Sequence, residues 1–421
     1  MTDLASLEKD LNHFDLGTRR HALSALAAQA RTMSFPKRPL MAFNLHCHSF
    51  YSYNAEGLSP YGIVWMAKRM GLAAAGLVDF DVLDGVDEFF EAAELLGLPV
   101  VAGFETRCFL PEFSTRELNS PGEPGVTYHM GTGFVQSALT DPSFQAFFKG
   151  MADGAGKRNR DLIAKVNAFL DPVRLDYERD VLPLTPKGVA TERHICQAYD
   201  DKSRQVFPGD AERAQFWAGK LGPDGAKASA DPGKIQALIR GKTMKKGGVG
   251  YQAPTRETFP AVAEVNRFIQ AQKAIPMMTW LDGTSAGEGA VDELMDTEMK
   301  QGAAALNIVP DRNWNIADPE TRKKKVALLH EIVRKADERG LPIGIGTEMN
   351  GPGLKRVDDF DAPELLPVVP SFTRGARILA AHTRLQRTNG QGYLSEWAKG
   401  KFPQVKAKNA YFEDAGKELI G

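Results

Sequence analysis

The stretch Met41-Ala42-Phe43-Asn44-Leu45-His46-Cys47-His48 joins a short apolar run to two histidines that are separated by one residue. An apolar run of this length is typical of a buried strand. Because successive side chains of a strand point to opposite faces, histidines at positions i and i+2 share a face and can bind one metal ion together. The spacing alone is weak evidence, so the interpretation depends on the residues further along the chain.

Downstream of this stretch, apolar runs alternate with amphipathic segments. The apolar runs that predict strands cover residues 42–45, 73–78, 100–104, 133–135, 275–279, 304–309 and 343–346. Segments with helical spacing separate most of them, at residues 61–70, 86–96, 261–274 and 321–339. Strands that alternate with helices predict a mainly parallel sheet, and about seven such units predict a closed or nearly closed α/β barrel.

The remaining regions predict additions to this barrel. Residues 1–38 have helical spacing and form a predicted N-terminal segment, followed by a barrel over residues 39–360. Within the barrel, residues 200–250 carry several turn signals and predict a small helical insertion. We expect this insertion to lie over the barrel mouth, where it would restrict the size of the substrate. Residues 361–421 form a predicted C-terminal extension.

The composition is that of an ordinary soluble globular protein, with 43% hydrophobic and 25% charged residues in a chain of 421. The formal net charge of −1 attracts neither nucleic acid nor an anionic membrane, so we expect a small substrate rather than long nucleic acid. Three cysteines argue against a disulfide framework. There is no secretory pattern and no apolar run of the ~18 residues that a membrane span needs, which predicts a cytoplasmic protein. The oligomeric state stays open.

Polar side chains follow several of the predicted strands, and in a barrel these strand ends lie together. They are His46, His48, Asp79, Glu105, Glu348 and Asn350, and His129 leads into the strand predicted at 133–135. Carboxylates and imidazoles in one place are typical of a divalent metal site. Singly, each has a structural alternative: Glu105 could pair with Arg107, Asp79 could cap a helix, and His129 could be a buried structural histidine. Their joint placement favours the metal site.

The order of these motifs resembles the PHP (polymerase and histidinol phosphatase) superfamily. The stretch from Asn44 to Ser52 looks like its opening H-x-H-S/T motif, Gly103-Phe104-Glu105 looks like its glutamate motif, and His129 comes next. Arg193-His194-Ile195 looks like a segment of the nucleotide-hydrolysing branch, in which a small helical domain comes after it. The resemblance covers residues 40–360. It implies a distorted seven-stranded, TIM-like α/β barrel that hydrolyses phosphate esters with two or three ions, usually Mn, Fe or Zn.

The chain departs from the family at several ligand positions. Phe80 stands where the family has a ligand, Thr279-Trp280 replaces Ala-His-Pro, and Glu348-x-Asn350 replaces a closing Asp-x-His. These changes favour one or two divalent ions over three. The metal ligands that the resemblance implies are His46, His48, Glu105, His129, His194, Glu348 and Asn350.

The implied activity is that of a metal-dependent phosphoesterase, which cleaves a small phosphorylated metabolite or nucleotide with a metal-activated water. Arg193 is predicted to contact the substrate phosphate, with Arg107 and Arg356 as alternates, although each arginine could instead form a surface ion pair. Asp79 is predicted either to act as a general base or to orient a ligand imidazole.

Two other functions stay open on the sequence. A degenerate barrel could bind metal and ligand without efficient turnover, as Phe80, Trp280 and Asn350 indicate. A hydrolase of another bond type could use the same ions, because fold and metals do not define the substrate.

Overall fold

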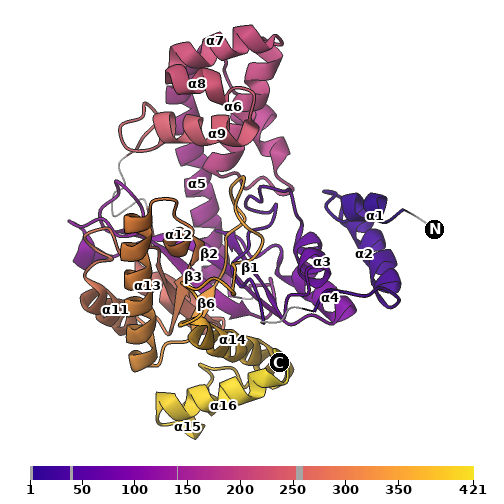
Figure 1. Ribbon diagram of the computed structural model, residues 1–421, viewed down its shortest axis with the longest axis vertical. Helices are drawn as coiled ribbons and strands as arrows, with labels where there is room; N and C mark the ends of the chain where they lie inside the picture. Colours follow the sequence, from indigo (N-terminus) through magenta and orange to yellow (C-terminus); the bar gives the residue numbers. More distant parts are fainter. Residues whose placement is uncertain (1–2, 38–40, 140, 253–258) are drawn as a thin grey trace.

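The computed structural model describes residues 3–37, 41–139, 141–252 and 259–421, and the strands of these residues form one curled sheet (Figure 1). Its strands lie in sequence order: β1 Ala75–Phe80, β2 Val100–Phe109, β3 Val126–Phe134, β4 Ile275–Trp280, β5 Ala305–Ile308 and β6 Ile343–Ile345. The pairs β1–β2, β4–β5 and β5–β6 are parallel, whereas β3 runs antiparallel to both of its neighbours. The sheet is therefore mixed, with six strands rather than the seven expected.

The expected first strand is present only as isolated bridges. Its stretch 44–48 nevertheless contacts both edges of the sheet: Gly76 N donates to Asn44 O at 2.7 Å beside β1, and Leu45 N donates to Ile345 O at 2.8 Å beside β6. No long ladder forms on the β6 side, because the chain beyond β6 turns at Glu348 with φ 64°. The observed architecture is a curled half-barrel whose two edges are bonded to one short extended stretch.

Helices pack around this sheet. Those that connect or follow its strands are α3 Pro60–Arg69, α4 Val86–Leu96, α10 Val262–Ala271, α11 Val291–Lys300, α12 Asp311–Trp314 and α13 Pro319–Arg339. The bounds of α4 are those predicted, since Gly97 in the left-handed conformation ends the helix. Helix α13 begins at the Asp318 cap, which accepts a hydrogen bond from Thr321 N, and it ends at Gly340.

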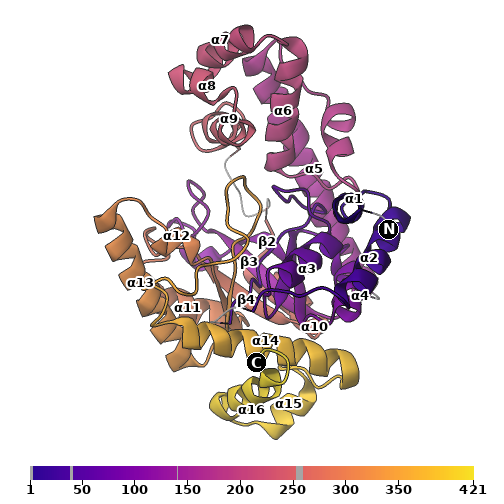
Figure 2. The ribbon, with the colours of Figure 1, turned by 45° about the vertical axis from the view of Figure 1, so that its right-hand side comes forward.

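Terminal helices cover the side and the base of the sheet (Figure 2). Helices α1 Leu4–Asp10 and α2 Leu16–Ala30 lie beside α3 and α4, where the buried Arg19 and Glu88 form an ion pair at 2.7 Å. Helix α14 Val369–Asn389 crosses below the strands, with α15 Glu396–Lys401 and α16 Val405–Lys417 beneath it. The base of the sheet is thus covered, and the carboxyl ends of β1, β2 and β6 point toward the opposite side.

A helical lobe stands over those carboxyl ends (Figures 1 and 2). It consists of α5 Pro142–Leu170, α6 Glu192–Val206, α7 Asp210–Leu221, α8 Pro223–Ala228 and α9 Pro232–Ile239. The lobe has its own hydrophobic core, which includes Val166, Tyr199, Trp217 and Ile235. Residues 200–250 are helical as predicted, but they share this core with α5 and α6, so the lobe is larger than the predicted insertion.

The predicted division into three parts stays a prediction, and its first boundary at residues 38 and 39 lies outside the described residues. Among the helices described, none combines the length and the apolar character that a membrane span requires.

Candidate metal centre

Three donor side chains converge at the carboxyl end of the sheet. His48 Nε2 lies 3.2 Å from Glu105 Oε2, His46 Nε2 lies 3.5 Å from the same oxygen, and the two Nε2 atoms are 3.3 Å apart. All three residues are buried. Among the described residues, they are the one group of three or more His, Cys, Asp or Glu whose donor atoms lie within 4.8 Å of one another.

The hydrogen-bond network directs both imidazole lone pairs toward Glu105. His46 Nδ1 lies 3.2 Å from Asn307 Oδ1, an acceptor, which assigns the ring proton to Nδ1. His48 Nδ1 lies 3.3 Å from Ser52 Oγ, whose own hydroxyl donates to Asp79. Both Nε2 atoms are then acceptors that face an oxygen which itself has no hydrogen-bond partner. Such a set of bare acceptors fits a divalent cation.

The charges of these residues fit the same conclusion. Burial alone would raise the pKa of Glu105, but the neighbouring His46 and His48 hold it well below its usual range. Burial alone would lower the pKa of His46, and Glu105 raises it instead. The carboxylate therefore stays ionised beside a positive charge, which is a proton on an imidazole when no cation is bound. A divalent cation would replace that proton and bind the neutral rings through Nε2.

Asp79 lies behind His48 and is not among the residues that line the large cavity above Glu105. Its oxygens accept hydrogen bonds from Ser49 N and Ser49 Oγ at 2.6 Å each and from Ser52 Oγ at 2.7 Å. Of the two predicted roles, this geometry favours orienting a ligand imidazole, through Ser52, over acting as a general base.

Phe80 occupies the space beside His48 where the family would have a ligand. Its ring stacks on the His48 imidazole, with centroids 4.5 Å apart and planes 11° apart. Trp280, at the second altered position, is fully buried. The apolar Phe80 ring holds the imidazole and adds no donor atom.

The prediction that His129 belongs to this group is wrong, because the residue lies on the other face of the sheet. In the register between β2 and β3, Glu105 lies opposite Met130 and Thr106 lies opposite His129. Side chains of paired residues share a face, so Glu105 and His129 point in opposite directions. His129 instead contacts Asn266 of α10 and lies 3.6 Å from Glu298 of α11.

His194 is also not brought into the group. It lies in the first turn of α6, where its Nδ1 accepts a hydrogen bond from Thr191 N at 3.1 Å as part of a capping box. Its ring packs edge-on against Tyr53, with centroids 5.0 Å apart. Burial lowers the pKa of His194 to about 3, so it is a neutral capping residue in this structure.

Glu348 and Asn350 both line the cavity, but neither joins the three donors. The Glu348 carboxylate is bound by Arg312 Nη2 at 2.7 Å. Its backbone holds the histidine stretch instead: Glu348 N donates to His46 O at 2.8 Å, and His48 N donates to Glu348 O at 2.9 Å. Of the seven predicted ligands, the structure brings together His46, His48 and Glu105.

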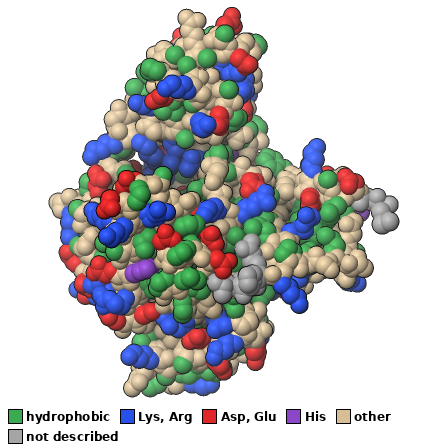
Figure 3. Space-filling view, viewed as in Figure 1, with side chains coloured by type: hydrophobic (Ala, Val, Ile, Leu, Met, Phe, Trp, Pro, Cys, Tyr) green, Lys and Arg blue, Asp and Glu red, His purple; other side chains and the backbone are tan. Residues whose placement is uncertain are grey.

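The large cavity above Glu105 opens between the sheet and the helical lobe. It has a volume of about 1480 Å³, and its lining includes Phe80, Tyr128 and many charged side chains. The cationic residues among them are Arg107, Lys157, Arg158, Arg193, Arg240, Lys245, Lys246 and Arg312. Figure 3 shows Lys and Arg side chains gathered around the hollow between the lobe and the body. The acidic residues of the same lining are equally numerous: Asp81, Glu105, Glu117, Glu123, Asp161, Glu192, Glu264 and Glu348. Ion pairs join several residues of the two kinds, among them Lys245 with Glu192 and Arg312 with Glu348, so the wall carries charges of both signs.

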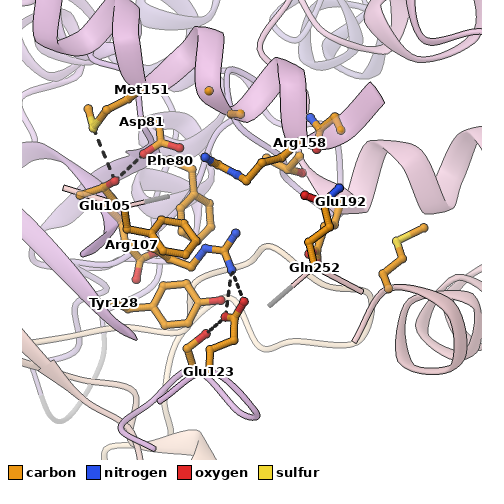
Figure 4. Close-up of a pocket in the computed structure, with 18 of the residues that line it drawn as sticks. Phe80, Asp81, Glu105, Arg107, Glu123, Tyr128, Met151, Arg158, Glu192 and Gln252 are labelled. Carbon is orange, nitrogen blue, oxygen red and sulfur yellow. Dashed lines mark hydrogen bonds and ion pairs between the residues drawn. The ribbon is translucent and has the colours of Figure 1, made fainter. Parts of the chain in front are cut away.

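The three predicted phosphate-binding arginines have different surroundings. Arg107 points into the cavity (Figure 4), where it pairs with Glu123 at 3.0 Å and lies over the Phe259 ring. Arg193 also lines the cavity. Arg356 is not among the lining residues and forms an ion pair with Glu56, so the structure does not bring it to the cavity.

Several residues of this site were missed by the sequence prediction. Asn307 lies inside the strand predicted at 304–309, so the rule that selected Glu105 from the end of its strand does not reach it. Arg312 follows β5 within the short helix α12 and was not selected. The lobe cations Arg158 and Arg240 follow no strand, and their place at the cavity depends on the packing of the lobe.

Comparisons with known proteins agree with this fold. No protein-family profile matches the chain. An error-prone DNA polymerase from Cutibacterium acnes is 38% identical over 78 residues, which are 18% of this chain and 7% of the polymerase.

Two solved structures are similar in fold. An amidohydrolase from Chromobacterium violaceum, determined with bound sulfate and no metal, has a TM-score of 0.53 and 16% identity, over 78% of this chain and 96% of its own. A protein from Bifidobacterium adolescentis, provisionally named a metal-dependent phosphoesterase, has a TM-score of 0.50 and 16% identity, over 80% of this chain and 98% of its own. The two structures show a shared fold, and they and the short polymerase match fit the resemblance to the PHP superfamily that the motif order indicates.

Proposed function

We propose that this protein is a metal-dependent phosphoesterase that acts on a small phosphorylated metabolite or nucleotide. The observation that carries the proposal is that three metal donors occur together with Arg193 at one cavity, which Glu105 and Arg193 both line. The donors suit a divalent cation, and the Arg193 guanidinium suits a negatively charged group of the substrate. The small net charge of the chain disfavours long nucleic acid and anionic membranes as partners.

His46, His48 and Glu105 would hold the ion, which their nitrogen and oxygen donors suit as Mn, Fe or Zn. When bound, such an ion polarises a phosphoryl oxygen and acidifies water. The chain's own residues prepare this site by orientation: Asn307 and Ser52 keep the ring protons on Nδ1, so both Nε2 lone pairs stay directed at the ion.

Arg193 is suited to bind the substrate phosphate. Its guanidinium lines the cavity and, among the described residues, has no hydrogen bond or ion pair of its own. Burial and the charge of Arg240 lower its pKa, and the attraction of Glu348 does not offset them. A guanidinium whose charge is incompletely compensated gains most from a bidentate contact with an oxyanion.

Arg107 is less available than Arg193, because Glu123 and the Phe259 ring already contact it. It would orient a more distant part of the ligand. Phe80 and Tyr128, with ring centroids 6.1 Å apart beside the donors, give the same wall an apolar surface. The names of the two similar structures, a metal-dependent phosphoesterase and a sulfate-bound amidohydrolase, support a hydrolase that accepts a tetrahedral oxyanion.

Turnover of a generic aryl phosphate, with and without added Mn²⁺, tests the proposal. We expect Mn²⁺-dependent release of the phenol by the wild type, no release by His48→Ala, and full release by Arg356→Gln, whose ion pair lies outside the cavity. A parallel set of aryl esters and amides tests the other bond types. Hydrolysis of these alone would assign the protein to a different class of hydrolase.

A degenerate barrel without turnover is the second candidate, and one observation favours it. Phe80 fills the space beside His48, and His129 points away from the site, so the donor set is small. If the protein binds Mn²⁺ and inorganic phosphate but releases no product from any ester or amide, this second function is the correct one.

A further inference from the structure

Arg312 is a cationic residue of the cavity wall that the proposed function does not yet use. It follows β5, five residues after Asn307, whose side chain contacts His46. Its guanidinium binds Glu348, whose backbone is bonded to both His46 and His48. An ion pair and two backbone hydrogen bonds therefore connect Arg312 to the histidine stretch through Glu348.

Glu348 is held in an unusual backbone conformation. Glu348 and Met349 both lie in the left-handed region, with φ 64° and 57°. This conformation is unfavourable for a residue with a Cβ, and such strain gathers at functional sites. The turn lets the Glu348 backbone bond the histidine stretch while its carboxylate points to Arg312.

The Arg312 guanidinium is still available to a ligand. Its side chain keeps 46% of its surface accessible, whereas that of its partner Glu348 keeps 9%. Both residues and Glu105 line the same cavity, so the accessible surface of Arg312 faces the space above the donors. A guanidinium has five N–H donors, and a contact through Nη2 leaves others free for an oxyanion.

The number of metal donors is small enough that the positive charge of Arg312 could act beside the ion. The three donors of this group are enough for one ion, and the other carboxylate bonded to the histidine stretch, Glu348, is committed to Arg312. We propose that the centre holds a single ion and that Arg312, positioned by Glu348, supplies the second positive charge to the phosphoryl group. Glu348 is then a positioning residue rather than a metal ligand. This inference rests on the proposed function for the nature of the ligand.

Metal stoichiometry tests the assignment of Glu348. The full-length wild type, Arg312→Gln and Glu348→Gln are incubated with Mn²⁺, desalted and analysed for metal. One ion per chain is expected in all three. Two ions in the wild type and one in Glu348→Gln would overturn the proposal, because Glu348 would then be a ligand.

Binding of inorganic phosphate to the Mn²⁺-loaded proteins, measured by calorimetry, tests Arg312. We expect Arg312→Gln to bind phosphate roughly tenfold to a hundredfold more weakly than the wild type, the range for loss of a charged contact. Arg356→Gln is the matched control, since Arg356 also pairs with a glutamate and is 51% accessible, but lies outside the cavity. Equal phosphate affinity in the two variants would overturn the proposal.

A conservative variant covers the case that Arg312→Gln does not fold. Arg312→Lys keeps the charge and loses the planar fork, so phosphate binding at least roughly threefold weaker than in Arg356→Lys is expected, and equal binding contradicts the proposal. Both measurements are independent of turnover. If the wild type cleaves no phosphate ester, the proposed function fails, while metal count and phosphate affinity still decide the role of Arg312.

Discussion

Two buried clusters of histidine and glutamate lie on opposite faces of the same sheet, and they differ in charge. In the inner cluster, His48 Nε2 lies 3.2 Å from Glu105 Oε2; in the outer cluster, His129 Nδ1 lies 3.6 Å from Glu298 Oε2. The pKa of Glu105 is lowered, whereas burial raises the pKa of Glu298 to about 8 and lowers that of His129 to about 4. Similar distances thus accompany opposite protonation states.

The number of imidazoles explains the difference. Two histidines face Glu105, and together they keep it ionised despite its burial. One histidine faces Glu298, its Nε2 is taken up by Asn266, and the charge of Glu112 raises the pKa of Glu298 further. The outer pair is therefore neutral near pH 7, with a protonated Glu298 beside the bare Nδ1 of His129. A short distance between histidine and glutamate is not enough to make a metal centre.

The largest difference between the clusters should appear in metal retention. His48→Ala removes one of three donors, so Mn²⁺ affinity should fall on the order of a hundredfold or more. His129→Ala should retain the same amount of Mn²⁺ per chain as the wild type. Elemental analysis after incubation with Mn²⁺ and desalting measures both. Metal loss in His129→Ala would place the outer histidine in the centre and remove the distinction.

The outer cluster should instead affect stability as a function of pH. The ordinary pKa values of glutamate and histidine are 4.5 and 6.5, whereas the folded values are about 8 and about 4. Between pH 6.5 and 8 the folded pair holds one proton and the unfolded pair holds none, so stability falls as pH rises. The loss over this window is about 2 kcal/mol. Between pH 4.5 and 6.5 both states hold one proton, and the pair contributes no slope.

Urea unfolding at a series of pH values measures this effect. In Glu298→Gln the amide does not titrate, so the decline between pH 6.5 and 8 should be smaller by about 2 kcal/mol than in the wild type. An equal decline in both proteins would show that Glu298 is ionised at neutral pH. The comparison of the two proteins removes the contributions of other groups.

A smaller effect is expected behind the inner cluster. Ser52→Ala removes the hydrogen-bond partner of His48 Nδ1, and Mn²⁺ affinity should fall roughly tenfold. Ser49→Ala is the control, because Ser49 bonds the same Asp79 but not His48. Calorimetric titration with Mn²⁺ compares them. Equal losses of Mn²⁺ affinity in the two variants would mean that Asp79 acts on the site through Ser49 and Ser52 together.

The smallest effect concerns the ring beside His48. Phe80→Leu keeps an apolar side chain but loses the stacking contact, which is worth roughly 0.5–1.5 kcal/mol. We therefore expect Mn²⁺ affinity to fall about threefold in the same titration. An unchanged affinity would show that Phe80 only fills space.

Local patterns in the sequence predicted much of this arrangement. Because side chains alternate along an extended chain, the sequence predicted that His46 and His48 share a face. The position of Glu105 at the end of a predicted strand predicted that it lies near them. The bounds of α4 followed from its apolar spacing and Gly97. These features depend on neighbours within a few residues, so a single sequence is enough to predict them.

Long-range packing decided the features that were wrong or missed. The strand carrying His129 was expected only at residues 133–135, whereas β3 spans Val126–Phe134 and runs antiparallel. The face of the sheet on which the His129 side chain lies could therefore not be derived from the sequence. His194 became a cap of α6, and Arg356 was paired by Glu56. None of these outcomes is visible in local spacing.

The sequence by itself determined which residues could be donors and that helices alternate with strands, because side-chain period and helix caps are local properties. Only the tertiary structure decided which donors meet. The pairing of β2 with β3 turned His129 outward, the left-handed turn at Glu348 directed its carboxylate to Arg312, and the helical lobe brought Arg193 to the cavity that Glu105 also lines. Each outcome depends on which face or partner a distant element presents, and this is set by the free energy of packing the whole chain.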